Sequence, residues 1–496
     1  MRDRSTRLVV AIAATKLAVH LLTNGQYGFH RDELATIDDA RHLDWGYVAY
    51  PPLTPFVGRV ALLLFGPSLT GVRTFAALAL SLSVLLAGLM ARELGGGRAA
   101  QLTAALAVAI GPVVLAGSAL FQYVAFDFLW WVLIACLLLR LSNTDDTRWW
   151  LAIGAAIGLA VETKYTIGFC VAGVVLGLLL ARRQDLRSPW LWAGVGLAVL
   201  LALPNLVWQV RHDFISLTFL RSIHERDVRI GRTEGFLRDQ LTVASNPVTV
   251  PLWIVGLFWL LRSWKQRRER LLACFVLVPF VLLWLARGRG YYAAPLYPLL
   301  LAAGAVAVEA WATRIVTSIR RLFRALEWTL FTVGAAVALV ALPVAPVGSA
   351  LWRFAIANND DLAEEIGWPE LVKTVAGVYA SLPADERAHT RVLAGNYGEA
   401  GAVNLYGAAY GLPEAISGIN SYWARGYGDP PPRTVIALGM SREGLERRFS
   451  SCTLAAQVPS PLGVRNEETE QHPDIFLCHD LRQPWPDFWR EFRHFG

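Results

Sequence analysis

The chain has 496 residues, of which 55% are hydrophobic and only 17% are charged, and its mean hydropathy is +0.41. A soluble globular domain carries about 25% charged residues, so the composition excludes an ordinary soluble enzyme and indicates an integral membrane protein. The net charge of +7 does not require nucleic acid, because basic residues collect in the cytoplasmic loops of membrane proteins. We expect a lipid bilayer as a partner and no nucleic acid.

The apolar runs predict about eleven transmembrane helices, since most of them approach the roughly 20 residues that cross a bilayer. They lie at 8–23, 73–91, 99–119, 124–141, 149–162, 165–181, 189–208, 248–262, 271–286, 291–312 and 328–347. Alternate connections are short and basic, such as "ARRQDLRS", "RSWKQRRER" and "RIVTSIRRLFR". The positive-inside rule assigns these connections to the cytoplasm.

The remaining segments then face outward and define two predicted domains. Residues 1–348 are a transmembrane domain with long extracytoplasmic loops at 24–72 and 209–247, and the first loop reads as helices lying along the interface. Residues 349–496 are a soluble extracytoplasmic α/β domain, in which "RVLAGNYGEAGAVNLYG" reads as strand, turn and helix, and "RTVIALG" as a strand.

Two cysteines in the second domain are relevant to whether that domain lies outside the cytoplasm. Cys452 and Cys478 both lie there, and a disulfide between them is compatible with an extracytoplasmic location. Their spacing alone does not show that they are close in space, so the prediction leaves the pairing open.

The stretch "NGQYGFHRDELATIDDARHL", residues 24–43, places many charges directly after the first apolar run. Its His-Arg-Asp triplet does not belong to a protein kinase, because no glycine-rich strand precedes it and no Asp-Phe-Gly follows. For Asp38, Asp39 and Asp44 we expect an ordinary solvated loop.

Asp32 and Glu33 differ because further ionisable residues are predicted at the same outer membrane level. These are Asp127 in "FQYVAFDFLWW", Lys164 in "AVETKYTIG" and Arg289 in "LARGRGYYAAPLYPLL". Ionisable groups at membrane depth are costly, so they usually line a polar cavity or pair with one another. A structural kink in which Glu162 and Lys164 neutralise each other is the alternative for that motif.

The chemistry of this set points to a lipid-linked phosphate. A carboxylate can take a proton from an attacking hydroxyl, and Lys and Arg can hold a phosphate and stabilise the charge that grows as it departs. Apolar grooves between helices can hold a long lipid. No His or Cys spacing suggests a metal cage. We therefore expect no cofactor, and the sequence leaves a divalent cation open.

These motifs, in this order, resemble glycosyltransferase family 39, the protein O-mannosyltransferase and aminoarabinose-transferase-like group of the GT-C superfamily. The resemblance rests on the acidic pair after the first membrane helix, "YPPL", the aspartate of the second outer loop, "TKYT" and "GRGYYAAPLYPLLLAAGA". The tail "NYGEAGAVNLYGAAYGLPEAISGINSYWARGYG" and the closing "FWREFRHFG" resemble bacterial members with a C-terminal extracytoplasmic domain.

The resemblance implies an inverting transfer of a sugar from a polyprenyl phosphate. Its catalytic carboxylate falls on Asp32, with Glu33 beside it, and the second-loop acid falls on Asp127. Members with protein substrates often carry a β-trefoil insert, which the sequence does not show, so the acceptor stays open among lipid, glycan and protein.

We therefore predict a polytopic α-helical plasma-membrane protein of GT-C type that moves a hexose or pentose from a polyprenyl-phosphate donor to an acceptor in the cell envelope. The predicted substrate- and phosphate-binding residues are Arg31, Lys164, Tyr165, Arg289, Tyr291 and Tyr292. Two alternatives remain: a polyprenyl-lipid transporter or flippase, and a non-catalytic envelope-assembly protein.

Overall fold

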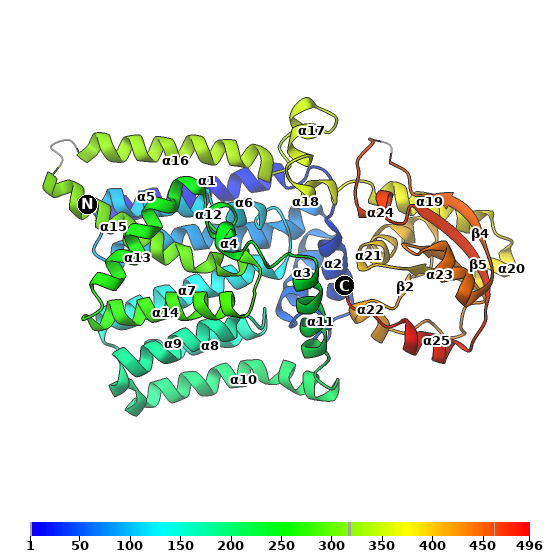
Figure 1. The fold of residues 1–496 in the computed structure, drawn as a ribbon, viewed down its shortest axis with the longest axis horizontal. Coiled ribbons are helices and arrows are strands. Elements are labelled where there is room, and N and C mark those ends of the chain that lie inside the picture. The colour runs from blue at the N-terminus through cyan, green and yellow to red at the C-terminus, as the bar shows by residue number, and fades with distance from the viewer. Residues whose placement is uncertain (1, 316–318, 461) are drawn as a thin grey trace.

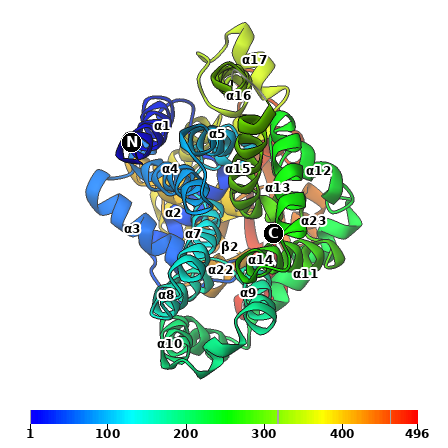
Figure 2. The same ribbon diagram turned by 90° about the vertical axis from the view of Figure 1, so that its left-hand side faces the viewer.

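The structure, a computed structural model, describes residues 2–315, 319–460 and 462–496, and it consists of a helical bundle followed by a C-terminal α/β part (Figure 1). The long helices run side by side, as the end-on view in Figure 2 shows. The N-terminus lies at one end of the bundle, and the C-terminal part packs against the other end (Figure 1).

The bundle is built from sixteen α-helices and three short 3-10 helices within the described residues. They are α1 (Arg2–Thr23), α2 (Arg31–Arg41), α3 (Leu53–Phe65), α4 (Leu69–Glu93), α5 (Arg98–Ala109), α6 (Pro112–Ala116), α7 (Tyr123–Thr144), α8 (Trp149–Val161), α9 (Ile167–Ala181), η1 (Arg183–Arg187), α10 (Pro189–Arg211), α11 (Ile215–Arg229), α12 (Phe236–Thr242), η2 (Pro247–Thr249), α13 (Val250–Arg262), α14 (Arg267–Leu285), η3 (Gly290–Leu296), α15 (Tyr297–Ile315) and α16 (Ile319–Ala341).

The predicted apolar segments are helical, but the count of eleven membrane spans is not confirmed. Among the described residues, six helices are long and apolar enough to cross a bilayer, or seven if the bent pair formed by α12 and η2–α13 is one span. Both α8, with 13 residues, and α9, with 15, fall short of the roughly 20 residues that a span needs. The predicted span 99–119 is broken where Pro112 starts α6.

The predicted cytoplasmic connection "RIVTSIRRLFR" includes residues 316–318, which lie outside the described part of the chain.

The two long loops predicted to face outward contain helices that gather at the end of the bundle next to the C-terminal part. Both α2 and α3 come from residues 24–72, and α11 comes from residues 209–247 (Figure 1). The helical content predicted for the first loop is therefore confirmed. Because α2 packs against α3 on one side and against the C-terminal part on another, most of its residues are buried.

The C-terminal part contains a five-stranded sheet in the order β2-β1-β3-β5-β4. Its elements are α17 (Ala350–Ile356), α18 (Asp360–Ala363), α19 (Trp368–Ser381), α20 (Ala384–Ala388), β1 (Thr390–Ala394), α21 (Tyr397–Tyr406), η4 (Gly407–Tyr410), β2 (Ile416–Ser417), α22 (Asn420–Ala424), β3 (Thr434–Leu438), α23 (Arg442–Arg448), β4 (Phe449–Gln457), α24 (Glu467–Glu470), β5 (Asp474–Leu481) and α25 (Trp485–Phe492). The predicted strand–turn–helix and the strand at "RTVIALG" are both present, as β1–α21 and β3.

The sheet is covered on both faces, and the alternation of side chains explains this. Strands β1, β2 and β3 are parallel, whereas β5 runs antiparallel to β3 and to β4. On β3, Ile436 and Leu438 belong to the cluster that includes α19 and α21, whereas Val435 and Ala437 pack with the aromatic residues of α25. Continuous apolar runs are typical of strands that are buried on both faces.

Cys452 on β4 and Cys478 on β5 are directly opposite each other and form a disulfide. The pairing that the sequence left open is therefore present.

Candidate active site

A cavity of about 1130 Å³ lies where the end of the bundle meets the C-terminal part. Its walls come from α2, the start of α7, the turn between α8 and α9, α11, the segment before η3, and residues of α18, α21 and α22. Six of the nine residues predicted from the sequence line this cavity: Arg31, Asp32, Lys164, Tyr165, Arg289 and Tyr292. The other three, Glu33, Asp127 and Tyr291, are not part of its lining.

The first turn of α2 sends three consecutive charged side chains in three directions, because successive residues of an α-helix are rotated by about 100°. Arg31 points to the C-terminal part, Asp32 faces the cavity, and Glu33 enters the bundle. His30 caps the helix, since its Nδ1 accepts a hydrogen bond from the Asp32 backbone N–H at 3.1 Å. Arg31, Asp32 and Glu33 are therefore neighbours in one helix turn, but each has a different structural environment.

Asp32 is held by neutral hydrogen-bond donors. Its Oδ1 accepts from the Tyr397 hydroxyl at 2.8 Å, and its Oδ2 accepts from the Gln122 side-chain amide. His30 Nδ1 lies 3.9 Å from Oδ2, but that nitrogen already accepts a hydrogen bond and gives Asp32 no proton. The Asp32 side chain keeps 30% of its surface exposed. Asp32 is thus a fixed carboxylate that a cavity ligand can reach.

Glu33, by contrast, is completely buried, and both of its carboxylate oxygens accept hydrogen bonds. Its two carboxylate oxygens accept from the Arg73 guanidinium at 2.8 and 2.7 Å, from the Phe121 N–H at 2.7 Å and from the His30 N–H at 2.9 Å. Arg73 also lies 3.2 Å from the Glu365 carboxylate. This arrangement ties α2 to α4 and to the C-terminal part, and it gives Glu33 no contact with the cavity.

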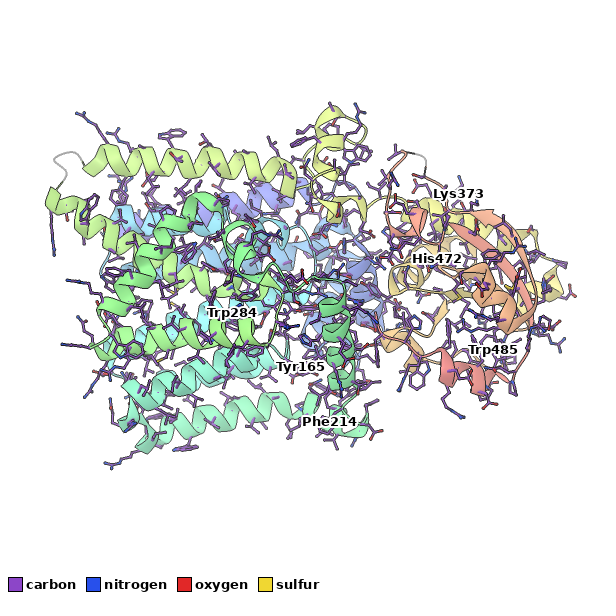
Figure 3. The ribbon with its side chains drawn as sticks, in the orientation of Figure 1. Tyr165, Phe214, Trp284, Lys373, His472 and Trp485 are labelled. Atoms are coloured by element: carbon purple, nitrogen blue, oxygen red, sulfur yellow. A yellow bond between two sulfur atoms is a disulfide. The ribbon has the colours of Figure 1, made fainter. Side chains whose placement is uncertain are left out.

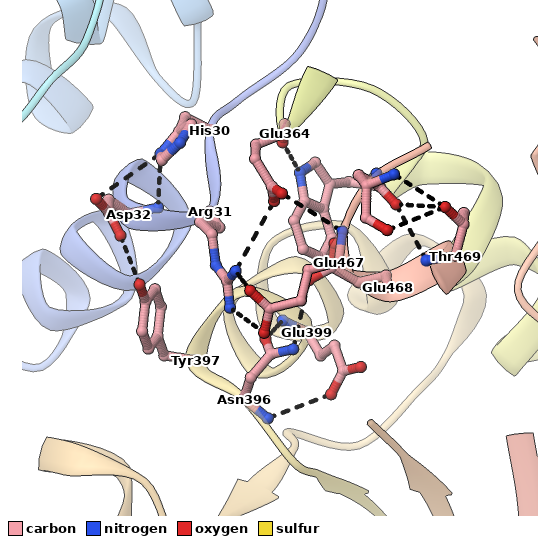
Figure 4. Close-up of polar contacts among 12 residues, drawn as sticks. His30, Arg31, Asp32, Glu364, Asn396, Tyr397, Glu399, Glu467, Glu468 and Thr469 are labelled. Atoms are coloured by element: carbon pink, nitrogen blue, oxygen red, sulfur yellow. Dashed lines mark hydrogen bonds and ion pairs between the residues drawn. The ribbon is translucent and has the colours of Figure 1, made fainter. Parts of the chain in front are cut away.

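Arg31 lines the cavity, but its guanidinium is engaged elsewhere. It donates to both oxygens of Glu467 and lies 3.9 Å from Glu364 (Figure 4). Its charge is already balanced, so Arg31 suits the predicted role in phosphate binding less well than the other cations of the wall.

Lys164 also lines the cavity and lies close to three aromatic rings. Its Nζ is 4.0 Å from the Tyr292 ring centroid, 5.2 Å from Tyr123 and 5.5 Å from Tyr291. Asp127 Oδ2 lies 4.0 Å from the same Nζ, and Trp131 donates to Asp127 Oδ1. Asp127 therefore stands behind Lys164 and orients it.

The alternative pairing of Glu162 with Lys164 is not found. Glu162 Oε1 is buried without a hydrogen-bond partner among the described residues, and the cation that could have balanced it faces Asp127 instead. The interpretation of "VETKY" as a self-neutralising kink is therefore wrong.

Arg289 stands at the head of a basic region. It donates to Asp227 Oδ2 at 2.6 Å, and Arg226 and Arg232 lie 3.6 and 4.0 Å from the other Asp227 oxygen. One aspartate thus faces three arginines, which leaves a net positive charge on this wall. Further cavity-lining cations are Arg221 and Arg287. Three arginines of the loop 209–247 therefore line the cavity: Arg221, Arg226 and Arg232.

Tyr165 has a fixed hydroxyl, because it donates to Asn205 Oδ1 at 3.0 Å and accepts from Gln209 Nε2 at 2.7 Å. It lies near the end of the bundle beside α11 (Figure 3). Apolar side chains complete the same cavity, among them Phe169, Phe219 and Leu283. The cavity therefore combines a carboxylate, a cationic wall and an apolar wall.

No group of three or more His, Cys, Asp or Glu side chains that could hold a metal ion is found in the described ranges.

Comparisons with known proteins agree with this geometry. Residues 49–208 match the family described as dolichyl-phosphate-mannose-protein mannosyltransferase. The chain is 27% identical over 290 residues to the lipid A galacturonosyltransferase RgtD of Rhizobium johnstonii, a match that spans 57% of this chain and 60% of that protein. It is 28% identical to the undecaprenyl phosphate-alpha-4-amino-4-deoxy-L-arabinose arabinosyl transferase 1 of Pseudomonas fluorescens, over 50% of this chain and 47% of the relative.

The fold comparison extends over nearly the whole chain. The crystal structure of ArnT from Cupriavidus metallidurans bound to undecaprenyl phosphate superimposes with a TM-score of 0.60 and 16% identity, and covers 95% of this chain and 98% of ArnT. The resemblance to the family 39 group is confirmed. The chain shares the fold of ArnT, and it spans less than two thirds of the two curated relatives.

The expectation of a solvated loop holds for the exposed Asp44 and is wrong for Asp38 and Asp39. These two are buried in the last turns of α2, and the Arg425 guanidinium donates to both carboxylates. The Tyr50 hydroxyl also donates to Asp39 at 2.6 Å. The sequence near Asp38 and Asp39 does not reveal this burial, because their partner Arg425 lies about 390 residues away in the C-terminal part.

Sequence reasoning also missed Tyr397, Gln122, Arg73 and Asp227. Arg73 carried a usable signal, because it stands alone in the apolar helix "GVRTFAALAL" and charged residues at membrane depth are usually paired or functional. Tyr397 and Gln122 are ordinary polar residues near helix starts, and no local pattern indicates that they meet Asp32.

Proposed function

We propose that the protein is an inverting glycosyltransferase that uses a polyprenyl-phosphate sugar. The observation that carries the proposal is the cavity itself: a reachable carboxylate held by neutral donors shares one space with a cationic wall and an apolar wall. The related proteins named as transferases of galacturonic acid and aminoarabinose, and the undecaprenyl phosphate bound to ArnT, support a donor of this class.

Asp32 is the proposed general base. The acceptor hydroxyl gives its proton to Asp32 as its oxygen attacks the anomeric carbon from the face opposite the phosphate. The bond between that carbon and the phosphate oxygen breaks, and the phosphate keeps the electron pair. One base is enough, because a phosphate leaves readily once its charge is balanced, whereas a glycosidase needs a second carboxyl group as acid.

Lys164, Arg289 and the cavity-lining arginines of the loop 209–247 are the proposed phosphate ligands. A cation at the departing phosphate stabilises the charge that develops in the transition state. Lys164 is held in place by Asp127 and the tyrosine rings, so its charge is oriented before the donor arrives. Tyr165 and Tyr292 are proposed as walls of the donor site, whereas Tyr291 lies outside the cavity lining and faces Lys164 with its ring.

The proposed location of this chemistry is the outer face of the plasma membrane. It rests on the basic connections predicted to be cytoplasmic and on the position of α2, α3 and α11 at the end of the bundle that meets the C-terminal part (Figure 1). Residues 349–496 are then an extracytoplasmic domain, and the disulfide between Cys452 and Cys478 fits an oxidising compartment.

The test is transfer by the purified protein reconstituted into lipid vesicles. Undecaprenyl-phosphate 4-amino-4-deoxy-L-arabinose and polyprenyl-phosphate galacturonic acid are supplied separately with lipid A, and products are identified by mass spectrometry. We expect a glycosylated lipid A from one donor. Movement of the donor across vesicles without transfer would favour a flippase, and donor binding with neither activity would favour an assembly protein.

A further inference from the structure

The C-terminal domain is seated directly on the helix that carries Asp32. Helix α21 crosses α2 at Gly398 and Gly401. A Cβ atom at Gly401 would lie 2.8 Å from the Leu34 carbonyl carbon, and one at Gly398 would lie 2.9 Å from Arg31 Cβ. Real Cβ atoms do not approach backbone so closely, and only glycine lets the two helices come this near.

The close packing of α21 on α2 places one side chain of the C-terminal domain next to Asp32, the proposed base. Tyr397 is the first residue of α21, and its hydroxyl donates to Asp32 Oδ1 at 2.8 Å (Figure 4). Burial, followed by the neighbouring Asp32 carboxylate, holds the pKa of Tyr397 well above its ordinary value. The hydroxyl therefore keeps its proton and remains a donor to the carboxylate.

The position of Tyr397 is fixed by the elements on which it stands. It follows β1 after two residues, and a capping box holds the start of α21: Asn396 Oδ1 accepts from the Glu399 N–H at 2.9 Å, while Glu399 Oε2 accepts from the Asn396 N–H at 3.3 Å. The Arg31 guanidinium lies 5.0 Å from the Tyr397 ring centroid and is itself bound by Glu467. The capping box and the contact with Arg31 therefore keep Tyr397 in position next to Asp32.

We propose that Tyr397 is a positioning residue for Asp32, and that the C-terminal domain thereby completes the active site of the bundle. This rests on the proposed function of Asp32 as base. Tyr397 holds Oδ1 and Gln122 holds Oδ2, so the plane of the carboxylate is fixed in a residue that lines the cavity. Groups that are fixed before the substrate binds lower the cost of reaching the reactive geometry.

The first experiment is Tyr397→Phe, which removes one hydroxyl and keeps the ring over Arg31. We expect turnover to fall by about tenfold with little change in the KM for donor, since a hydrogen bond to a charged group is worth about this factor. The acid limb of the pH–rate profile moves to higher pH by about one unit, because the carboxylate loses a donor that favours its charged form. Tyr379→Phe is the matched control, as its hydroxyl bonds the Arg387 carbonyl within the same domain.

The second experiment needs no substrate. A hydrophobic carbodiimide modifies protonated carboxyl groups, and peptide mass spectrometry follows its reaction with Asp32 as the pH is raised. The midpoint of labelling should move to higher pH in Tyr397→Phe and stay at the wild-type value in Tyr379→Phe.

Substitutions at two glycines, Gly401 and Gly377, test the close packing of α21 on α2. Gly401→Ala should reproduce the shift in labelling, because its Cβ pushes α21 away from α2, whereas Gly377→Ala in α19 meets nothing within 4 Å and should not.

The outcomes separate the two proposals. If Tyr397→Phe and Gly401→Ala leave the labelling and the acid limb at wild-type values while Asp32→Asn is inactive, Tyr397 is only a structural contact and this inference is overturned. If Asp32→Asn itself transfers sugar at the wild-type rate, the base assignment falls and Tyr397 has no base to position. A lower melting temperature of Tyr397→Phe with unchanged pH dependence would also assign it a purely structural role.

Discussion

The first and the last turns of α2 both carry carboxylates, and the groups that meet those carboxylates differ. Asp32 in the first turn accepts hydrogen bonds from two neutral donors. Asp38 and Asp39 near the end of the helix are buried against the Arg425 guanidinium. Protonating a carboxylate that is paired with a fixed cation breaks the ion pair, a cost that Asp32 with its neutral donors does not carry. The charge of the partner therefore distinguishes Asp32, the candidate base, from Asp38 and Asp39, which have a structural role.

The largest effect on stability is expected for Arg73→Met. This change leaves Glu33 and Glu365 in the interior without their cation, and removing one partner of a buried ion pair costs about 3–5 kcal/mol. The melting temperature in detergent should fall by many degrees. Arg59→Met, at an exposed position of α3, is the control. Equal melting of the two variants would contradict the fastening role of Glu33.

Lys164→Met tests the cationic part of the cavity lining. We expect donor binding to weaken by about 10- to 100-fold, since a charge-assisted hydrogen bond to a phosphate is worth about 1.5–3 kcal/mol. Binding of undecaprenyl phosphate can be measured by the change in tryptophan fluorescence. Lys373→Met removes a lysine of the C-terminal domain (Figure 3) and should bind as the wild type does. Unchanged binding in Lys164→Met would remove this residue from the donor site.

Arg425→Gln sharpens the comparison within α2. Asp38 and Asp39 lose their cation, but the Arg425 side chain is 24% exposed, so water can replace part of the interaction. We expect a loss of about 1–3 kcal/mol in stability and a smaller fall in turnover than for Asp32→Asn. Thermal unfolding and transfer assays on the same preparations provide the test. A loss of turnover equal to that of Asp32→Asn would place the last turn of α2 in the chemistry.

The smallest effect concerns pH. Burial, and after it the nearby Glu468 carboxylate, raises the pKa of Glu399 from an ordinary 4.5 to about 8. The folded chain then keeps a proton that the unfolded chain releases. The stability that Glu399 contributes is full below about pH 4.5 and is lost as the pH rises toward 8.

The melting temperature should therefore fall between pH 5 and 8, and Glu399→Gln should flatten part of that fall. Glu365 and Glu468, whose pKa values burial raises to about 8 and about 7, and Asp39, whose pKa burial raises to about 6, contribute further parts of the fall. An identical slope in Glu399→Gln and the wild type would show that Glu399 is ionised in the folded chain.

Much of this architecture follows from local sequence patterns. Apolar runs predict the helices, and the turn after "RVLAG" predicts β1 and α21, because periodicity and glycine positions are local properties. The order of the motifs also indicates the GT-C family. Six of the nine predicted site residues line one cavity.

The rest depends on contacts between distant segments. Nothing near Asp39 reveals Arg425, and nothing near Asp32 reveals Tyr397 or Gln122, since each partner lies 90 or more residues away. The number of spans is equally non-local, because a helix of 13 or 15 residues such as α8 or α9 is apolar enough to look like a span and too short to be one by itself.

The central claim is that Asp32 takes the proton of the acceptor, and a single-turnover assay tests it most directly. Asp32→Asn is loaded with the donor that the wild type uses, and product formation is followed after acceptor is added, with donor binding measured on the same sample. An amide keeps the size of the side chain but cannot accept the proton, so the rate should fall by about 10²- to 10⁴-fold while donor stays bound. A rate within a few fold of the wild type, with donor bound, would contradict the assignment.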